Sequence, residues 1–129
     1  MIRPATTKDI PEIKKLIDWA AENHKVLSRD EDELHQVIHN FFVWIEEDAI
    51  IGCCSLEIYN KKLAEVRSLV IRDLHQGKGI GRALVDACIH RAKEKGVYEV
   101  LTITDKDAFF EKLGFNKCLD DQWALFMKP

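Results

Sequence analysis

The stretch QGKGIG, residues 76–81, places glycines at three alternate positions directly before a helical pattern. It follows the apolar, β-branched run EVRSLVI, residues 65–71, and precedes ALVDACIHRAKEKG, residues 83–96. Glycine permits positive φ and lets a ligand come close to the unpaired N–H groups that begin a helix. Since that end of a helix also carries a partial positive charge, the stretch predicts either a phosphate-binding turn or a turn of purely structural use.

Apolar periodicity on both sides of the glycines predicts alternating strands and helices. After them, an apolar stripe of helical period ends at Gly96, which suits a C-terminal cap. Before them, breaks at EED and YNKK divide a β-branched region into an antiparallel meander. Its strands are predicted at residues 41–46, 49–58 and 63–71. A strand at 97–104 would then join the sheet through a right-handed parallel crossover.

The remaining elements complete one α/β domain with a mixed sheet, spanning residues 1–129. We find no linker, internal repeat or low-complexity tract that would divide the chain. The elements expected outside the meander and crossover are a strand at 2–5, a helix from Ile10, a polar connection at 24–32, a helix carrying Leu34, a short helix at 107–114 and a last strand, WALFM, at 123–127.

Composition narrows the classes of function. A net charge of -3 gives no electrostatic case for nucleic acid, and no apolar run is long enough to span a membrane. The N-terminus lacks the apolar core of a secretory signal, so we expect a cytoplasmic protein. The four cysteines have no metal-binding or disulfide-scaffold spacing, so we expect buried free thiols and no metal.

Two motifs together resemble a known family. The pattern Gln/Arg-x-x-Gly-x-Gly is met by Gln76, Gly79 and Gly81, and FFEKLGF, residues 109–115, is similar to a second signature. Both resemble the GNAT N-acetyltransferases, whose element order this chain matches over nearly its whole length. The resemblance implies acetyl-CoA as co-substrate and a mostly antiparallel sheet of six to seven strands with about four helices. It also implies that strands 4 and 5 splay apart to admit the pantetheine arm.

The resemblance assigns cofactor contacts to both motifs and to the fourth strand. An amide near Leu69 would polarise the thioester carbonyl as an oxyanion donor. Phe109 and Phe110 would border the cofactor. The residues expected to hold the pantetheine and the pyrophosphate are Leu69, Val70, Ile71, Gln76, Gly77, Lys78, Gly79, Ile80, Gly81 and Arg82.

Acid–base roles follow from the chemistry of the amine. An ammonium must lose a proton before it attacks, and Glu65 stands where many GNAT members place the base, with Glu57 as second choice. The alternative is that Glu65 is a cross-strand partner of a basic side chain. Many relatives also carry a tyrosine as acid, where this chain has Phe110. A thiolate can leave without a dedicated acid, because water reprotonates it readily.

A subgroup resemblance suggests the acceptor. VLSRDEDEL, residues 26–34, GCCSLEIY, residues 52–59, and AEVRSL, residues 64–69, are similar to N-acetylglutamate synthases and their short single-domain relatives. By that resemblance Arg29 and Arg67 bind the substrate carboxylate, for which an arginine fork is apt. The alternative for Arg29 is a solvated loop residue. The chain stops before the basic C-terminal residues that we expect the synthases to use for a second carboxylate.

Three functions therefore stay open. The first is acetyl transfer to an amino acid, with L-glutamate as first candidate and arginine biosynthesis as the setting. The second is acetylation of a polyamine, an antibiotic or a protein amine. The third is a non-catalytic module that binds acyl-CoA. The apolar segment at 123–127 makes a homodimer plausible, whereas a small-molecule amine is the only other partner expected.

Overall fold

The computed structural model describes residues 1–24 and 26–129. Lys25, which belongs to the connection expected at 24–32, lies outside the described residues. The strands are β1 (Ile2–Pro4), β2 (Phe41–Glu46), β3 (Ala49–Ile58), β4 (Leu63–Ile71) and β5 (Glu99–Thr102), and the helices are α1 (Ile10–Asn23), α2 (Glu31–Val37), α3 (Ile80–Glu94) and α4 (Asp107–Lys112). Short 3₁₀ turns stand before α1, β2 and α3.

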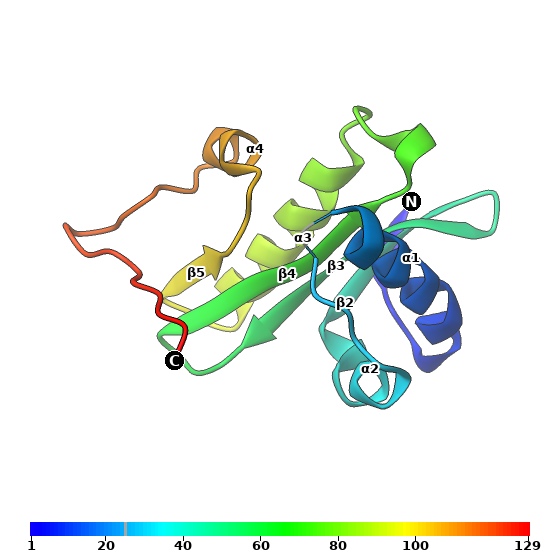
Figure 1. Cartoon of the computed structure of the whole chain (residues 1–129), viewed down its shortest axis with the longest axis horizontal. Helices are drawn as coiled ribbons and strands as arrows, with labels where there is room; N and C mark the ends of the chain where they lie inside the picture. Colours follow the sequence, from blue (N-terminus) through cyan, green and yellow to red (C-terminus); the bar gives the residue numbers. More distant parts are fainter. Residues whose placement is uncertain (25) are drawn as a thin grey trace.

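One mixed sheet forms the middle of the molecule, in the order β1-β2-β3-β4-β5 (Figure 1). The first four strands are antiparallel, and β5 lies parallel to β4. This confirms the predicted meander and crossover. Alternation along β3 sends Cys53 into the core beneath α1 and Cys54 into the core beneath α3, because successive strand residues face opposite ways. Cys88 is also buried and Cys118 is partly exposed, all as free thiols.

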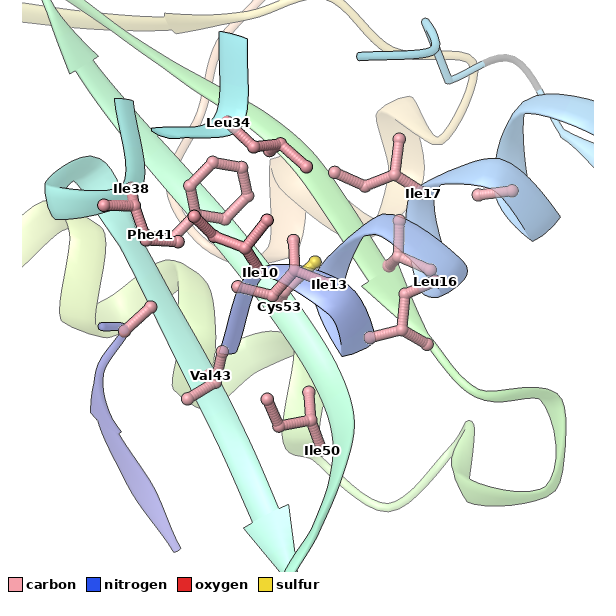
Figure 2. Packing of buried hydrophobic residues seen from close by; sticks show 13 residues of the cluster. Ile10, Ile13, Leu16, Ile17, Leu34, Ile38, Phe41, Val43, Ile50 and Cys53 are labelled. Carbon is pink, nitrogen blue, oxygen red and sulfur yellow. The ribbon is translucent and has the colours of Figure 1, made fainter. Parts of the chain in front are cut away.

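The helix α1 is fixed to the sheet by a stripe of aliphatic side chains. Ile10, Ile13 and Ile17 recur at helical spacing and are at most 1% exposed. They pack with Phe41 and Val43 of β2 (Figure 2). Full burial of such a side chain stabilises the fold by about 1.5–3 kcal/mol. Figure 1 shows α1 and α2 on one side of the sheet and α3 on the other.

The expectation of six to seven strands is wrong, because among the described residues the sheet has five. The segment 123–127 forms no strand: Leu125 is 90% exposed and Phe126 is 72% exposed, so neither packs against this chain. Before it, Leu119 and Gln122 form an isolated bridge around a tight turn at Asp120 and Asp121, both with positive φ. Apolar composition favours a strand only where a neighbouring edge receives it. A homodimer through this segment stays a prediction.

The short strand β5 pairs with the first part of β4 over its whole length. Their register runs from Leu63 opposite Glu99 to Val66 opposite Thr102, where β5 ends. The Thr102 hydroxyl donates to the Val66 carbonyl at 3.0 Å and closes this paired part. The chain then leaves toward α4, which Figure 1 shows apart from the sheet. The separation of strands 4 and 5 expected from the resemblance stays a prediction, because β5 ends where its pairing with β4 ends.

No helix among the described residues has the length and apolar character needed to cross a membrane.

Candidate active site

A cleft of about 580 Å³ lies along β4, beyond the end of β5. Its walls come from β4, from the turn before α3, from the end of β5 with α4, and from the C-terminal end of α1. Of the residues predicted for the site, the cleft is lined by Glu65, Arg67, Leu69, Val70, Ile71, Gln76, Gly77, Gly79, Ile80, Gly81, Arg82, Phe109 and Phe110. Lys78 and Arg29 do not line it. The fold thus brings most of the motif at 76–81 and the first two residues of the motif at 109–115 to one cavity.

The glycine turn presents backbone N–H groups to this cleft. Gly77 and Gly79 have φ of 79° and 82°, a region that only glycine adopts without strain. Gly79 is the N-cap of α3, and no side chain caps the helix there. A methyl group on either glycine would meet nothing within 4 Å, so the space above the turn is open. The amides of the first turn of α3 are therefore free to receive an anion.

The third glycine of the motif has a packing role. Gly81 lies in α3, and a Cβ there would stand 3.3 Å from Cζ of Phe109. The Phe109 ring meets Phe110 edge-on with centroids 5.0 Å apart, and Phe110 is 5% exposed. The two signature segments therefore touch, with Phe109 at the border of the cleft and Phe110 mainly in the core. Gln76 holds the turn to β4 by donating from Nε2 to the Ile71 carbonyl at 3.1 Å.

The part of β4 that lines the cleft contains a bulge. The β3–β4 register shifts between Cys53 and Ser55, which gives β4 one extra residue. Ser68 has φ of 55°, a left-handed conformation that is uncommon for a residue with a Cβ. A bulge leaves ladder groups of its strand unpaired, and the Leu69 amide is carried on the peptide next to Ser68. The role of the Leu69 N–H as oxyanion donor stays a prediction.

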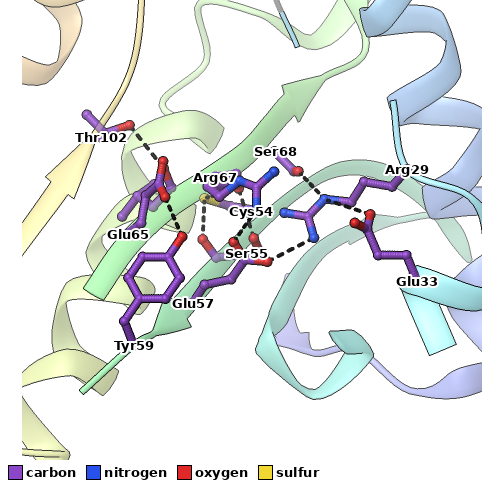
Figure 3. A network of polar contacts seen from close by, with 11 residues as sticks. Arg29, Glu33, Cys54, Ser55, Glu57, Tyr59, Glu65, Arg67, Ser68 and Thr102 are labelled. Atoms are coloured by element: carbon purple, nitrogen blue, oxygen red, sulfur yellow. Dashed lines mark hydrogen bonds and ion pairs between the residues drawn. The ribbon is translucent and has the colours of Figure 1, made fainter. Parts of the chain in front are cut away.

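The predicted base, Glu65, also lies on β4 and lines the cleft. The carboxylate of Glu65 accepts a hydrogen bond from the Tyr59 hydroxyl at 2.5 Å (Figure 3). Burial, together with that hydrogen bond, raises the pKa of Tyr59 to about 12, so the hydroxyl stays protonated at neutral pH. Directly across the strands Glu65 faces Glu57 rather than a basic side chain. The geometry therefore argues against the cross-strand ion pair that was the alternative for Glu65.

Glu57 joins the two arginines predicted to bind substrate. Oε1 accepts from Nη1 of Arg29 at 2.9 Å, and Oε2 accepts from Nη1 of Arg67 at 2.7 Å (Figure 3). Burial alone would raise the pKa of Glu57, but the hydrogen bonds from both arginines outweigh it and hold that pKa below its ordinary value. With both oxygens engaged, Glu57 is a poorer base than Glu65.

The two arginines differ in exposure. The side chain of Arg67 is 29% exposed and reaches the cleft, whereas Arg29 is 3% exposed. Arg29 is thus no solvated loop residue: its Nε donates to Ser68 Oγ at 3.0 Å. Within the part of the chain that the structure describes, Nη2 of Arg29 is buried without a hydrogen-bond partner.

Two members of this network were not predicted from the sequence. Tyr59 and Ser68 lie in segments that resemble the synthases but were given no role, because each acts through a hydrogen bond to a side chain distant in sequence or across a hairpin. The period of two along β3 could have placed Tyr59 on the face of Glu57. No group of three possible metal ligands lies together among residues 1–24 and 26–129.

Comparison with known proteins decides the family. The model of the Acetyltransferase (GNAT) family matches residues 9–115. The chain belongs to the GNAT acetyltransferase family. Within it, the chain is 34% identical over 116 residues to an uncharacterized N-acetyltransferase of Chlorobaculum tepidum, covering 90% of this chain and 75% of that protein. It is 29% identical to an amino-acid acetyltransferase of Mycobacterium tuberculosis, covering 91% of this chain and 68% of the relative.

Solved structures with bound CoA have a similar fold. A Mycobacterium tuberculosis protein in complex with CoA superposes with a TM-score of 0.86 at 29% identity, over 92% of this chain and 73% of that one. The N-acetylglutamate synthase of Neisseria gonorrhoeae, complexed with coenzyme A and N-acetyl-glutamate, also gives 0.86 at 26% identity, over 95% of this chain. This chain spans only 29% of that synthase. The predictions of a GNAT N-acetyltransferase and of acetyl-CoA as its co-substrate are thereby confirmed.

Proposed function

We propose that this GNAT protein transfers the acetyl group of acetyl-CoA to the α-amino group of an amino acid, with L-glutamate as the first candidate. Support comes from the relatives named amino-acid acetyltransferase and from the synthase that holds N-acetyl-glutamate. Within this chain, the observation that carries the proposal is the position of Arg67. It lies in the cleft two residues from Glu65 on the same strand face, so one acceptor could meet a cation and a base together.

The transfer itself needs three groups of the chain. Glu65 takes a proton from the acceptor ammonium, directly or through water, and so frees the nitrogen lone pair. That nitrogen forms a bond to the thioester carbon, while the Leu69 N–H stabilises the charge that develops on the carbonyl oxygen. As the carbon–sulfur bond breaks, the nitrogen releases its second proton to water to give the neutral amide, and the CoA thiolate takes up a proton from water. Phe110 is buried and supplies no acid for this step.

Carboxylate recognition would fall to the arginine network. Arg67 has one Nη1 bond to Glu57, and its exposed part faces the cleft. A planar guanidinium can bind a carboxylate through two parallel bonds, which also fixes the direction of the amino group. Arg29 does not line the cleft, so Arg67 is the arginine that an acceptor carboxylate would meet there.

The test is an acceptor panel. The protein is incubated with acetyl-CoA and each amino acid in turn, and CoA release is followed with a thiol reagent. We expect turnover with amino acids whose α-carboxylate is free, and loss of that turnover when the same carboxylate is converted to an amide. A carboxylate-free amine that outperforms every amino acid would contradict the proposal and favour a polyamine, antibiotic or protein amine as acceptor. Acetyl-CoA binding without turnover on any amine would make the chain a binding module.

A further inference from the structure

Arg29 lies behind the wall of the cleft and is anchored at two points. Its Nη1 is held by Glu57 at 2.9 Å, and its Nε donates to Ser68 Oγ at 3.0 Å. The guanidinium also stands over the Phe41 ring, 5.4 Å from the centroid. A guanidinium is planar and rigid, so fixing one side of it against β3 and Phe41 fixes the nitrogen that meets Ser68. Arg29 therefore links β3 to the bulge of β4 through its two hydrogen bonds.

Ser68 has a strained backbone conformation that this link can stabilise. Its φ of 55° places it in the left-handed region, where the Cβ of any residue other than glycine is disfavoured. A second contact holds the other end of the residue, since Cys53 Sγ donates to the Ser68 carbonyl at 3.4 Å. Strained conformations of this kind persist only where the surrounding structure fixes them. The Arg29 bond to Oγ is the charged part of that restraint.

We propose that Arg29 is a positioning residue for acetyl transfer: it holds Ser68 in the left-handed conformation and so directs the Leu69 N–H into the cleft. The peptide unit that carries this N–H is bonded to the Cα of Ser68, so any change in the Ser68 dihedrals turns the donor. This role rests on the proposed function of Leu69 as oxyanion donor, but not on the identity of the acceptor. It differs from the carboxylate-binding role predicted from the sequence, which concerns the acceptor alone.

Kinetics with two acceptors separate these roles. Arg29→Lys keeps a cation beside Glu57 and loses the Nε–Oγ bond. If Arg29 positions the donor, kcat falls at least about tenfold both with L-glutamate and with butylamine, which has no carboxylate, because oxyanion stabilisation serves every acceptor. A rise in KM for L-glutamate alone, with unchanged kcat for butylamine, would overturn the proposal. Thermal unfolding of the variant establishes that it is folded.

A matched pair at Ser68 tests the same link while leaving the Arg29–Glu57 ion pair in place. Ser68→Ala and Ser68→Gly both remove Oγ, but only glycine adopts positive φ without strain. We expect Ser68→Ala to lose kcat as Arg29→Lys does, and Ser68→Gly to retain several-fold more. The double variant of Arg29→Lys and Ser68→Ala should have a kcat only slightly below that of either single variant, because both substitutions remove the same Nε–Oγ hydrogen bond. Equal losses for alanine and glycine, or fully additive losses, would overturn the proposal.

A structural measurement keeps this inference separate from the proposed function. The φ-sensitive HN–Hα coupling and the 13C shifts of Ser68, measured by NMR without any ligand, should move in Arg29→Lys. They should stay unchanged in Glu33→Gln, which alters an exposed carboxylate 3.9 Å from the same Nε. If the unaltered protein acetylates no amine, the proposed function fails, but the NMR measurement still tests whether Arg29 holds the conformation of Ser68. An unchanged Ser68 signal in Arg29→Lys would overturn the positioning role.

Discussion

Replacing Glu57 by glutamine should destabilise the fold by about 3 kcal/mol, because the substitution leaves a buried guanidinium without its carboxylate. The Arg29 side chain is 1% exposed and that of Glu57 is 11% exposed, so solvent cannot compensate the lost charge. The second partner, Arg67, is 29% exposed and adds less. Removing one partner of a buried pair costs about 3–5 kcal/mol, and the amide oxygen that remains places Glu57→Gln at the lower end.

Urea and thermal unfolding followed by circular dichroism measure this loss. For a domain of this size, about 3 kcal/mol corresponds to a fall in Tm of roughly 10 °C. The matched control is Glu33→Gln, whose carboxylate stands 3.9 Å from the same arginine but is 45% exposed, and which should change stability by less than about 1 kcal/mol. Equal effects of the two substitutions, or a loss below about 1 kcal/mol for Glu57→Gln, would show that the Arg29–Glu57 ion pair does not stabilise the fold.

The same pair predicts a pH dependence. The folded-state pKa of Glu57 is lowered by Arg29 and Arg67 despite burial, so the carboxylate binds its proton more weakly in the folded than in the unfolded chain. Its stabilisation is therefore fully present above the unfolded pKa of about 4.3 and is lost as the pH falls through the lower folded pKa. The stability difference between the unaltered protein and Glu57→Gln should accordingly shrink on acidification below about pH 4. A difference that stays constant down to pH 2 would contradict the assigned ion pairs.

Three further outcomes are expected. Glu65→Gln should lower kcat at neutral pH by about 10²–10⁴-fold with little change in KM for acetyl-CoA, and an unchanged rate would move the base elsewhere. Gly79→Ala should raise the KM for acetyl-CoA by roughly 5–30-fold, because alanine is strained at a φ of 82°. Gly81→Ala should raise this KM less, because it needs only a small shift of the Phe109 ring. Initial rates at varied acetyl-CoA concentration measure both KM values. An aromatic disulfide reagent should label Cys118 quickly in the native protein and the three buried thiols only after denaturation, and rapid labelling of a second thiol would contradict the assigned burial.

Local patterns in the sequence predicted most of the fold. The meander followed from alternating apolar residues and turn residues, and the crossover followed from the helix that separates β4 from β5. The last strand was mispredicted because 123–127 has strand-like composition, yet composition does not say whether an edge is there to receive it. A segment forms a strand only when it pairs with a second segment, and its own composition does not show whether that partner is present.

The candidate site was predicted unevenly for a related reason. The glycine turn is a local device, so its residues could be named from their order alone. The bulge at Ser68 is a shift of one residue between strands, which leaves no trace in a pattern of period two. The bond between Arg29 and Glu57 joins residues 28 positions apart, and its burial depends on how α2 meets the sheet. These contacts decide whether Arg29 binds the acceptor or supports the strand.

The opening beside the unpaired part of β4 also affects the lifetime of the protein in a cell. Beyond Val66 the edge of β4 has no neighbouring strand on the β5 side among the described residues, and unpaired strand edges can pair with other extended chains. A ligand that fills the opening favours the folded state by mass action, by about 2.7 kcal/mol at a hundredfold excess over its Kd. Under the proposed mode of binding, acetyl-CoA is therefore a chemical chaperone as well as a substrate. Starvation for acetyl-CoA would then shorten the lifetime of the enzyme as well as slow its turnover.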